Sequence, residues 1–264
     1  VDPFCPADKC CREGTCARAL DAVQRKFEGP YGGHESPAGI WVEPIQGEGG
    51  VVVPPEGFLE GLRGIADDND SLLIFDEIQT GFGRTGEWFA AEHWDVTPDA
   101  ITMAKGIGGS GLPIGAMMYH EQYDTWGPGG HVGTFRGNVP AFVGGTRAID
   151  YIESHDLLNH ATEVGEYLRT RFLELAEDVP EIVDIRGKGQ FTGVEFEVDG
   201  KPSKSLVESI QVECFNRGVL VWYAGRHKSV LRLLPPLVLT QRQAEVGIDI
   251  ITESIRDVLA DHDS

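Results

Sequence analysis

The sequence predicts an α/β protein, in which a mostly parallel sheet precedes a smaller α+β domain. From residue 40 onward, short apolar runs alternate with helical segments, which is typical of parallel strands covered by helices on both faces. After residue 155 short strands surround single helices, so we expect one domain over residues 1–155 and another over residues 156–264. The chain has 264 residues, 41% of them hydrophobic, which is enough for a full-sized core.

The expected elements follow the apolar periodicity in chain order. In the first domain we expect helices at 17–27, 55–67 and 140–154, and strands at 40–43, 71–75, 100–103 and 114–119. In the second domain we expect helices at 157–177, 205–217 and 241–259, and strands at 182–186, 192–198, 219–222 and 230–233.

The chain is strongly acidic, with 42 Asp and Glu residues against 22 Lys and Arg residues and a net charge of −20. This balance argues against nucleic acid or an anionic membrane as a partner. No apolar run approaches the length of a membrane span, and the N-terminus lacks a signal-peptide pattern, so we expect a cytoplasmic protein. An acid-rich, lysine-poor surface further predicts a salt-adapted cytoplasm, with an ordinary acidic enzyme as the alternative.

Four cysteines lie near the N-terminus, at Cys5, Cys10, Cys11 and Cys16. Their spacing lacks the C-x2-C pairs typical of zinc sites, so we expect free thiols and no metal, with zinc as the alternative. The chain starts at Val1 rather than at a methionine, and we expect it to be the C-terminal portion of a longer gene product.

Two polar residues follow neighbouring predicted strands. Asp76 ends one apolar run, and Lys105 follows another. The carboxyl ends of such strands form the edge at which open α/β folds bind ligands. A lone aspartate here would simply cap the next turn. Asp76 and Lys105 together supply what pyridoxal phosphate (PLP) needs. A lysine whose pKa is lowered by an apolar pocket offers an amine that forms an imine. The aspartate offers a carboxylate that keeps the pyridine nitrogen protonated.

The glycines after Lys105 also match the dinucleotide fingerprint G-x-G-x-x-G, over residues 106–111. That fingerprint requires a helix to begin directly after the glycines. Residues 112–118 instead predict a strand, and we therefore reject a dinucleotide-binding fold.

Four motifs, in this order, resemble the class III (ω-) aminotransferases of PLP fold type I. They are VEPIQGEGG at 42–50, FDEIQTGFGRTG at 75–86, the Lys105 segment, and GTFRGN at 133–138. The resemblance runs from about residue 38 to the C-terminus. It implies a PLP-dependent transaminase, with the first domain forming the C-terminal part of the large PLP-binding domain and the second forming the small domain.

The resemblance also implies roles for the residues that bind the cofactor. Lys105 matches the Schiff-base lysine, which also moves the proton as general base and acid. Asp76 matches the partner of the pyridinium nitrogen, and Gln79 the glutamine that bonds the phenolic oxygen. Thr134 matches the threonine that reaches the cofactor phosphate of the neighbouring subunit, which implies a homodimer.

Three further residues match substrate-binding positions of the family. Arg232 resembles the arginine that binds the α-carboxylate of glutamate. Glu48 matches a glutamate that pairs with this arginine and neutralises it when the second, ω-amino substrate binds. Glu43 matches a supporting carboxylate.

The stretches 123–131 and 133–138 look most like diaminobutyrate aminotransferases, which form L-2,4-diaminobutyrate from aspartate semialdehyde with glutamate as donor. Val139, Pro140 and Gln190 depart from the usual pattern, with Gln190 standing where leucine is common. The 4-aminobutyrate, ornithine and acetylornithine enzymes share the core residues and remain alternatives. Relatives carry a phosphate loop and a ring-stacking aromatic residue before the part matched here, so a non-catalytic fragment is a further alternative.

Overall fold

The computed structural model describes residues 15–28, 37–109, 111–134 and 136–262. The chain divides into two compact units, which consist of residues 1–44, 54–82 and 88–155 and of residues 45–53, 83–87 and 156–264. The predicted boundary between folding domains at residue 155 stays a prediction. Three of the four clustered cysteines and Phe135 lie outside the described residues, as does the side chain of Cys16.

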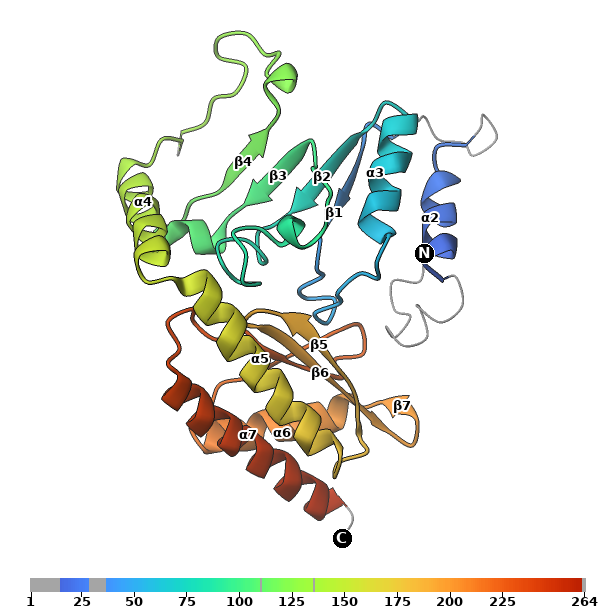
Figure 1. Cartoon of the computed structure of the whole chain (residues 1–264), viewed down its shortest axis with the longest axis vertical. Helices are drawn as coiled ribbons and strands as arrows, with labels where there is room; N and C mark the ends of the chain where they lie inside the picture. The colour runs from blue at the N-terminus through green and yellow to red at the C-terminus, as the bar shows by residue number, and fades with distance from the viewer. Residues whose placement is uncertain (1–14, 29–36, 110, 135, 263–264) are drawn as a thin grey trace. The chain divides into compact units, whose positions relative to one another are not determined.

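A four-stranded sheet of order β1-β2-β3-β4 forms the centre of the first unit (Figure 1). Strands β1 (Gly39–Val42), β2 (Leu72–Asp76) and β3 (Ala100–Met103) are parallel, and β4 (Ala116–Tyr119) is antiparallel to β3. The helices are α2 (Thr15–Gln24), α3 (Phe58–Asp68) and α4 (Val139–Ser154), with short 3-10 helices η1 (Ala90–His93), η2 (Lys105–Gly108) and η3 (Glu121–Tyr123). The predicted α/β fold with a mostly parallel sheet is confirmed.

Helix α3 packs on one face of this sheet, whereas α4 packs mainly against η2. Leucines of α3 cluster with Leu73 and Phe75, and Ile149 of α4 packs against Ile101 and Met103. The register of β2 and β3 puts these four strand residues on the same face. Trp41, on the opposite face, is exposed, and the expected helix cover of that face stays a prediction.

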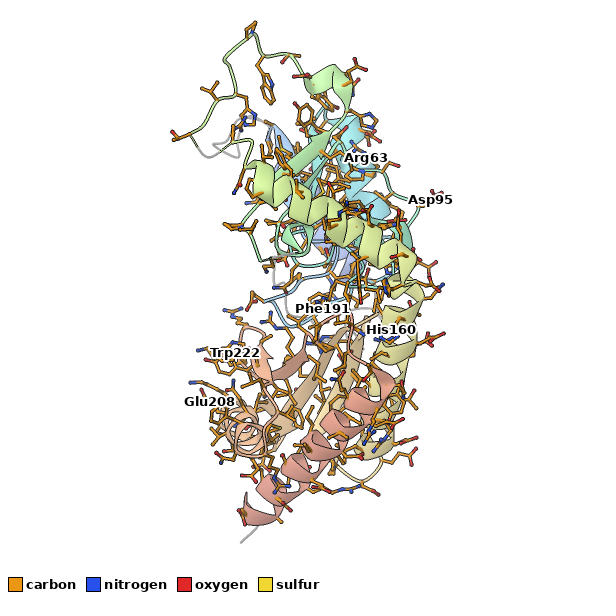
Figure 2. All side chains as sticks on the ribbon, turned by 90° about the vertical axis from the view of Figure 1, so that its left-hand side faces the viewer. Arg63, Asp95, His160, Phe191, Glu208 and Trp222 are labelled. Carbon is orange, nitrogen blue, oxygen red and sulfur yellow. The ribbon has the colours of Figure 1, made fainter. Side chains whose placement is uncertain are left out.

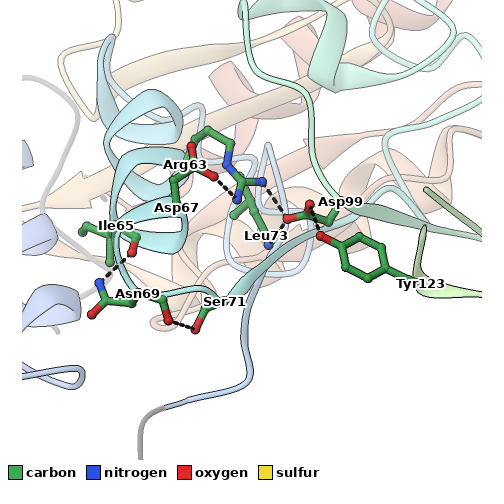
Figure 3. Close-up of polar contacts among 8 residues, drawn as sticks. All are labelled: Arg63, Ile65, Asp67, Asn69, Ser71, Leu73, Asp99 and Tyr123. Atoms are coloured by element: carbon green, nitrogen blue, oxygen red, sulfur yellow. Dashed lines mark hydrogen bonds and ion pairs between the residues drawn. The ribbon is translucent and has the colours of Figure 1, made fainter. Parts of the chain in front are cut away.

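A polar network around Asp99 anchors the starts of β2 and β3 (Figure 3). Its carboxylate accepts hydrogen bonds from Arg63 at 2.7 Å, from the backbone amide of Leu73 at 2.8 Å and from the hydroxyl of Tyr123 at 2.8 Å. Burial raises the pKa of Asp99, but these bonds outweigh burial and hold the pKa below its ordinary value. The network thereby sets the register that brings the far ends of the two strands together.

The second unit is built on an antiparallel sheet. Its order is β5-β6-β9-β8, with β7 paired to β6, and its members are β5 (Ile182–Lys188), β6 (Phe191–Val198), β7 (Lys201–Pro202), β8 (Trp222–Ala224) and β9 (Val230–Leu233). One face packs on helices α5 (Leu157–Ala176), α6 (Lys204–Asn216) and α7 (Gln241–His262) around a large apolar core. The predicted strand at 219–222 is wrong in position, because pairing with β9 begins only at Trp222, at the outside of the unit (Figure 2).

Local signals in the sequence fix several helix ends. Asn138 caps α4 by accepting a hydrogen bond from the amide of Ala141 at 3.4 Å, and Pro140 lies in the first turn. Ser203 caps α6 in the same way, with a bond of 3.3 Å from the amide of Leu206. Within the described residues, no helix is both long and apolar enough to cross a membrane.

Candidate active site

Asp76 and Lys105 lie at the carboxyl ends of adjacent parallel strands. Asp76 is the last residue of β2, and its register partner on β3 is Thr102. Lys105 opens η2, three residues beyond that partner. The predicted placement of both residues at one edge of the sheet is therefore present in the first unit.

The carboxylate of Asp76 is half-buried and has one oxygen in use. Its Oδ1 accepts a hydrogen bond from the amide of Ile78 at 3.1 Å, which caps the turn after β2. Within the described parts of the chain, Oδ2 of Asp76 makes no hydrogen bond. This oxygen is available to accept an N–H group from a ligand.

Lys105 has an unusual backbone conformation, with a left-handed φ of 45° directly after β3. Such strain in a residue other than glycine is uncommon and gathers at functional sites. The side chain of Lys105 is exposed among the described residues, and the apolar pocket expected around it stays a prediction.

Glu77 is a residue to which the sequence motifs assigned no role. Its buried carboxylate accepts hydrogen bonds from the amides of Ala90 at 3.0 Å and Ala91 at 2.8 Å, and from the hydroxyl of Thr80. Burial raises the pKa of Glu77, against the effect of these bonds. Glu77 thus ties η1 to the turn after β2 and holds the loop that carries Gln79. The sequence feature that could have pointed to Glu77 is its position, as a second acidic residue directly after the strand-end Asp76.

Three further predicted site residues lie in loops of the first unit. Gln79 is half-buried in the turn after β2, and Glu43 is half-buried just after β1. Thr134 is exposed in the segment before α4. Their roles toward cofactor or substrate stay predictions.

Glu48 and Arg232 form an ion pair in the second unit. Nη1 of Arg232 donates a hydrogen bond to Oε1 of Glu48 at 2.5 Å. The side chain of Arg232 is 8% exposed and that of Glu48 is 71% exposed. A buried guanidinium needs an anionic partner, whereas an exposed carboxylate loses little solvation when it moves away. Arg232 can therefore exchange Glu48 for the carboxylate of a ligand.

A cavity of about 800 Å³ in the second unit lacks such a pair of charges facing a ligand among the described residues that line it. It lies against α6 and α7, and its walls are mostly aliphatic and aromatic, including Phe215 and Leu220. Arg232 only borders it. We place the candidate substrate site at the Glu48–Arg232 pair because small amino acids and oxo acids are recognised by charge rather than by apolar area.

Residues 6–255 match the family model described as aminotransferase class-III. The chain belongs to the class III aminotransferases. A diaminobutyrate–2-oxoglutarate aminotransferase of Rhizobium meliloti is 37% identical over 240 residues, which is 88% of this chain and 51% of that protein. An acetylornithine aminotransferase of Methanosarcina mazei is 38% identical over 253 residues, covering 96% of this chain and 59% of that protein. The chain thus spans about half the length of the curated relatives it matches.

Solved structures of transaminases share the fold. The ornithine aminotransferase from Toxoplasma gondii, crystallised in the presence of oxidised glutathione, has a TM-score of 0.83 at 31% identity. The match covers 93% of this chain and 55% of that one. PLP at the active site is part of that protein's description. The fold type I assignment made from the sequence motifs is thereby confirmed.

Class III aminotransferases depend on PLP, and the residues present fit that cofactor. Asp76 offers a carboxylate oxygen for the ring N–H, and Lys105 offers a primary amine on the next strand end for the aldehyde. Among the described residues, no group of three or more His, Cys, Asp or Glu side chains could hold a metal ion.

Proposed function

We propose that this protein is a PLP-dependent transaminase, which moves an amino group between glutamate or 2-oxoglutarate and an ω-amino compound or its semialdehyde. The observation that carries the proposal is the placement of Asp76 and Lys105 at the carboxyl ends of adjacent strands, in a chain of the class III family. Bound PLP supplies an aldehyde that condenses with amines and a ring that accepts electrons from the substrate.

The residues of the first unit hold the cofactor and move the proton. Asp76 would accept the ring N–H through its Oδ2, and Gln79 would bond the phenolic oxygen. The amine of Lys105 would hold and move the proton of the amino acid's Cα, as general base and acid. An exposed lysine on a short, strained connection has the freedom that this transfer needs.

The residues of the second unit distinguish the two substrates. When glutamate is the donor, Glu48 leaves Arg232, which then binds the α-carboxylate of glutamate. When the ω-amino substrate binds by its distal amine, Glu48 stays on Arg232 and neutralises it. The carboxylate of that substrate is then not attracted to Arg232. Glu43 supports this arrangement as a second carboxylate. The contrast in exposure between Arg232 and Glu48 supports such an exchange.

For the ω-amino substrate we propose L-2,4-diaminobutyrate, formed from aspartate semialdehyde. Relatives named diaminobutyrate aminotransferases, at 37% identity, support this choice, as does the resemblance of residues 123–138. Acetylornithine is the second candidate, because acetylornithine aminotransferases are 38% and 39% identical to this chain.

We further propose that the enzyme works as a homodimer in a salt-rich cytoplasm. Thr134, which is exposed on its loop, would bond the cofactor phosphate of the neighbouring subunit. The net charge of −20 with only seven lysines supports the salt-adapted surface.

The test is a glutamate-driven assay against aspartate, succinate, glutamate and N-acetylglutamate semialdehydes, with 2-oxoglutarate as the measured product. We expect the highest kcat/KM for aspartate semialdehyde and complete loss of turnover in Lys105→Ala. Lys204→Ala, at the exposed first turn of α6, is the control for loss of a lysine and should keep wild-type rates. A preference for the N-acetylated compound would favour the second candidate, and absence of transfer to every acceptor would contradict the proposal.

A further inference from the structure

Glu48 lies at the tip of a tight hairpin formed by residues 46–52, called here the Glu48 hairpin. The amide of Gln46 donates to the carbonyl of Val52 at 3.0 Å, and the amide of Val52 donates back at 3.1 Å. Gly50 has a φ of 115°, which favours glycine and closes the turn. The hairpin belongs to the second unit, together with Arg232.

Arg186 of β5 holds this hairpin from one side. Its Nε donates a hydrogen bond to the carbonyl of Gly50 at 2.9 Å. Its Nη1 lies 2.5 Å from a carboxylate oxygen of Asp184 and 2.7 Å from one of Glu195. Two carboxylates thus neutralise and orient the guanidinium of Arg186, whose side chain is only 11% exposed, and its Nε is left to bond the hairpin.

The sheet places Arg186 and Arg232 on either side of one glycine. Gly193 of β6 pairs with Arg186 on β5 and with Arg232 on β9. Paired residues of adjacent strands point to the same face of a sheet. The side chains of Arg186 and Arg232 therefore lie on the face where a side chain at Gly193 would lie. A Cβ at Gly193 would lie 3.0 Å from Cβ of Val51 and 3.1 Å from the carbonyl of Gly50, which shows that the Glu48 hairpin fills that space.

The hairpin is therefore fixed at several points around Glu48. Arg186 binds the carbonyl of Gly50, the amide of Gly225 donates to the carbonyl of Glu48 at 3.0 Å, and Arg232 binds the Glu48 carboxylate. An acceptor that is held in place pairs with its donor at a smaller entropic cost than a mobile one. Loosening the hairpin should weaken the Glu48–Arg232 pair without touching either side chain.

We propose that Arg186 is a positioning residue, which sets how strongly Glu48 competes with a substrate carboxylate for Arg232. The inference rests on the proposed function, in which Arg232 binds carboxylates. By clamping the Glu48 hairpin, Arg186 determines the balance between the form of the site that accepts glutamate and the form that accepts the ω-amine.

The experiment measures the affinity of glutarate, a dicarboxylate without an amine, by isothermal titration calorimetry. Glu48→Ala should bind glutarate about tenfold more tightly than the wild type, because Arg232 no longer has an internal competitor, a difference of about 1.4 kcal/mol. Arg186→Gln should tighten binding severalfold. In the Glu48→Ala background, Arg186→Gln should have no further effect, because the hairpin then carries no carboxylate to position.

Arg171→Gln is the matched control. Arg171 also lies partly buried between two carboxylates, Glu174 and Asp249, but it does not bond the hairpin, so glutarate affinity should not change. If Arg186→Gln does not give a folded protein, Arg186→Lys replaces it. Lysine keeps the charge beside Asp184 and Glu195 but lacks the planar fork, and should give a smaller gain in affinity.

The two proposals fail in different ways. If Glu48→Ala tightens binding and Arg186→Gln changes nothing, or if Arg186→Gln acts equally in both backgrounds, Arg186 is not a positioning residue. If neither Glu48→Ala nor Arg232→Ala alters glutarate affinity, or if glutarate does not bind at all, the carboxylate site itself is wrong and both proposals fall.

Discussion

Single side chains hold charge in two different ways in the first unit. Glu77 is buried and its carboxylate is bonded to backbone amides, so it serves the loop around it. Asp76, its neighbour, uses one oxygen for the turn, and its other oxygen makes no hydrogen bond within the described residues. The motif assigned a role to Asp76, which stays a prediction, but none to Glu77, because the backbone amides that bind Glu77 lie on η1, more than ten residues along the chain.

Gln190 is a residue at which this chain departs from the family pattern. Its side chain is fully buried, and among the described residues neither its Nε2 nor its Oε1 has a hydrogen-bond partner. An unsatisfied buried amide costs about 1–3 kcal/mol. Gln190→Leu should therefore raise the free energy of unfolding by about 1–2 kcal/mol, measured by urea titration.

A second glutamine provides the control for this prediction. Nε2 of Gln211 donates to the carbonyl of Val221 at 3.0 Å. Gln211→Leu should lower stability by about 1 kcal/mol, because the carbonyl loses its partner. Loss of stability in Gln190→Leu would show that its amide is satisfied in solution.

Elements of regular structure were predicted well where the signal is local. The helix that follows Asn138 and the helix that follows Ser203 begin where their caps indicate. The strand expected at 219–222 was misplaced because its position depends on pairing with β9, and nothing near it in the sequence specifies that register. The clamp on the Glu48 hairpin was missed for the same reason, since Arg186 meets Gly50 from more than a hundred residues away.

Asp99 is expected to stabilise the β2–β3 pair in a pH-dependent manner. Its pKa is lowered in the folded state, so the stability it contributes is present above its unfolded pKa and is lost as the pH falls through its folded pKa. Asp99→Asn should lower the free energy of unfolding by about 2 kcal/mol at pH 7. The difference from the wild type should shrink as the pH falls below the ordinary value of 3.8, which urea titrations at several pH values would show.

Asp67→Asn is the matched control. Asp67 also pairs with Arg63, at 2.6 Å, but its side chain is mostly exposed, so the change should cost less than about 0.5 kcal/mol. A loss for Asp99→Asn that is equally large at pH 3 and pH 7 would contradict the role assigned to its ionised form.

At the scale of the whole molecule, the net charge of −20 leads us to expect stability that depends on salt. Repulsion among the carboxylates destabilises the compact chain, and concentrated salt screens it. We expect thermal unfolding in 2 M KCl to occur at a higher temperature than in 0.1 M KCl. A gain of about 1 kcal/mol corresponds to roughly 2–4 °C for a chain of this size. An equal or lower Tm in KCl would favour the ordinary acidic enzyme.

The family was recognisable from the sequence because four motifs occur in order, and the strand ends carry the residues that the chemistry requires. The exposure of Lys105 was not predictable, since it depends on what covers the strand ends. That Lys105 holds the cofactor is the central claim.

The most direct test of this claim is to incubate the protein with PLP, reduce it with borohydride, and map the attached pyridoxyl group by peptide mass spectrometry. We predict a single modified site at Lys105, absent from Lys105→Ala and weaker in Asp76→Asn. Lys204→Ala should label like the wild type. Labelling spread over several lysines, or labelling that persists in Lys105→Ala, would contradict the assignment of this lysine as the centre of the active site.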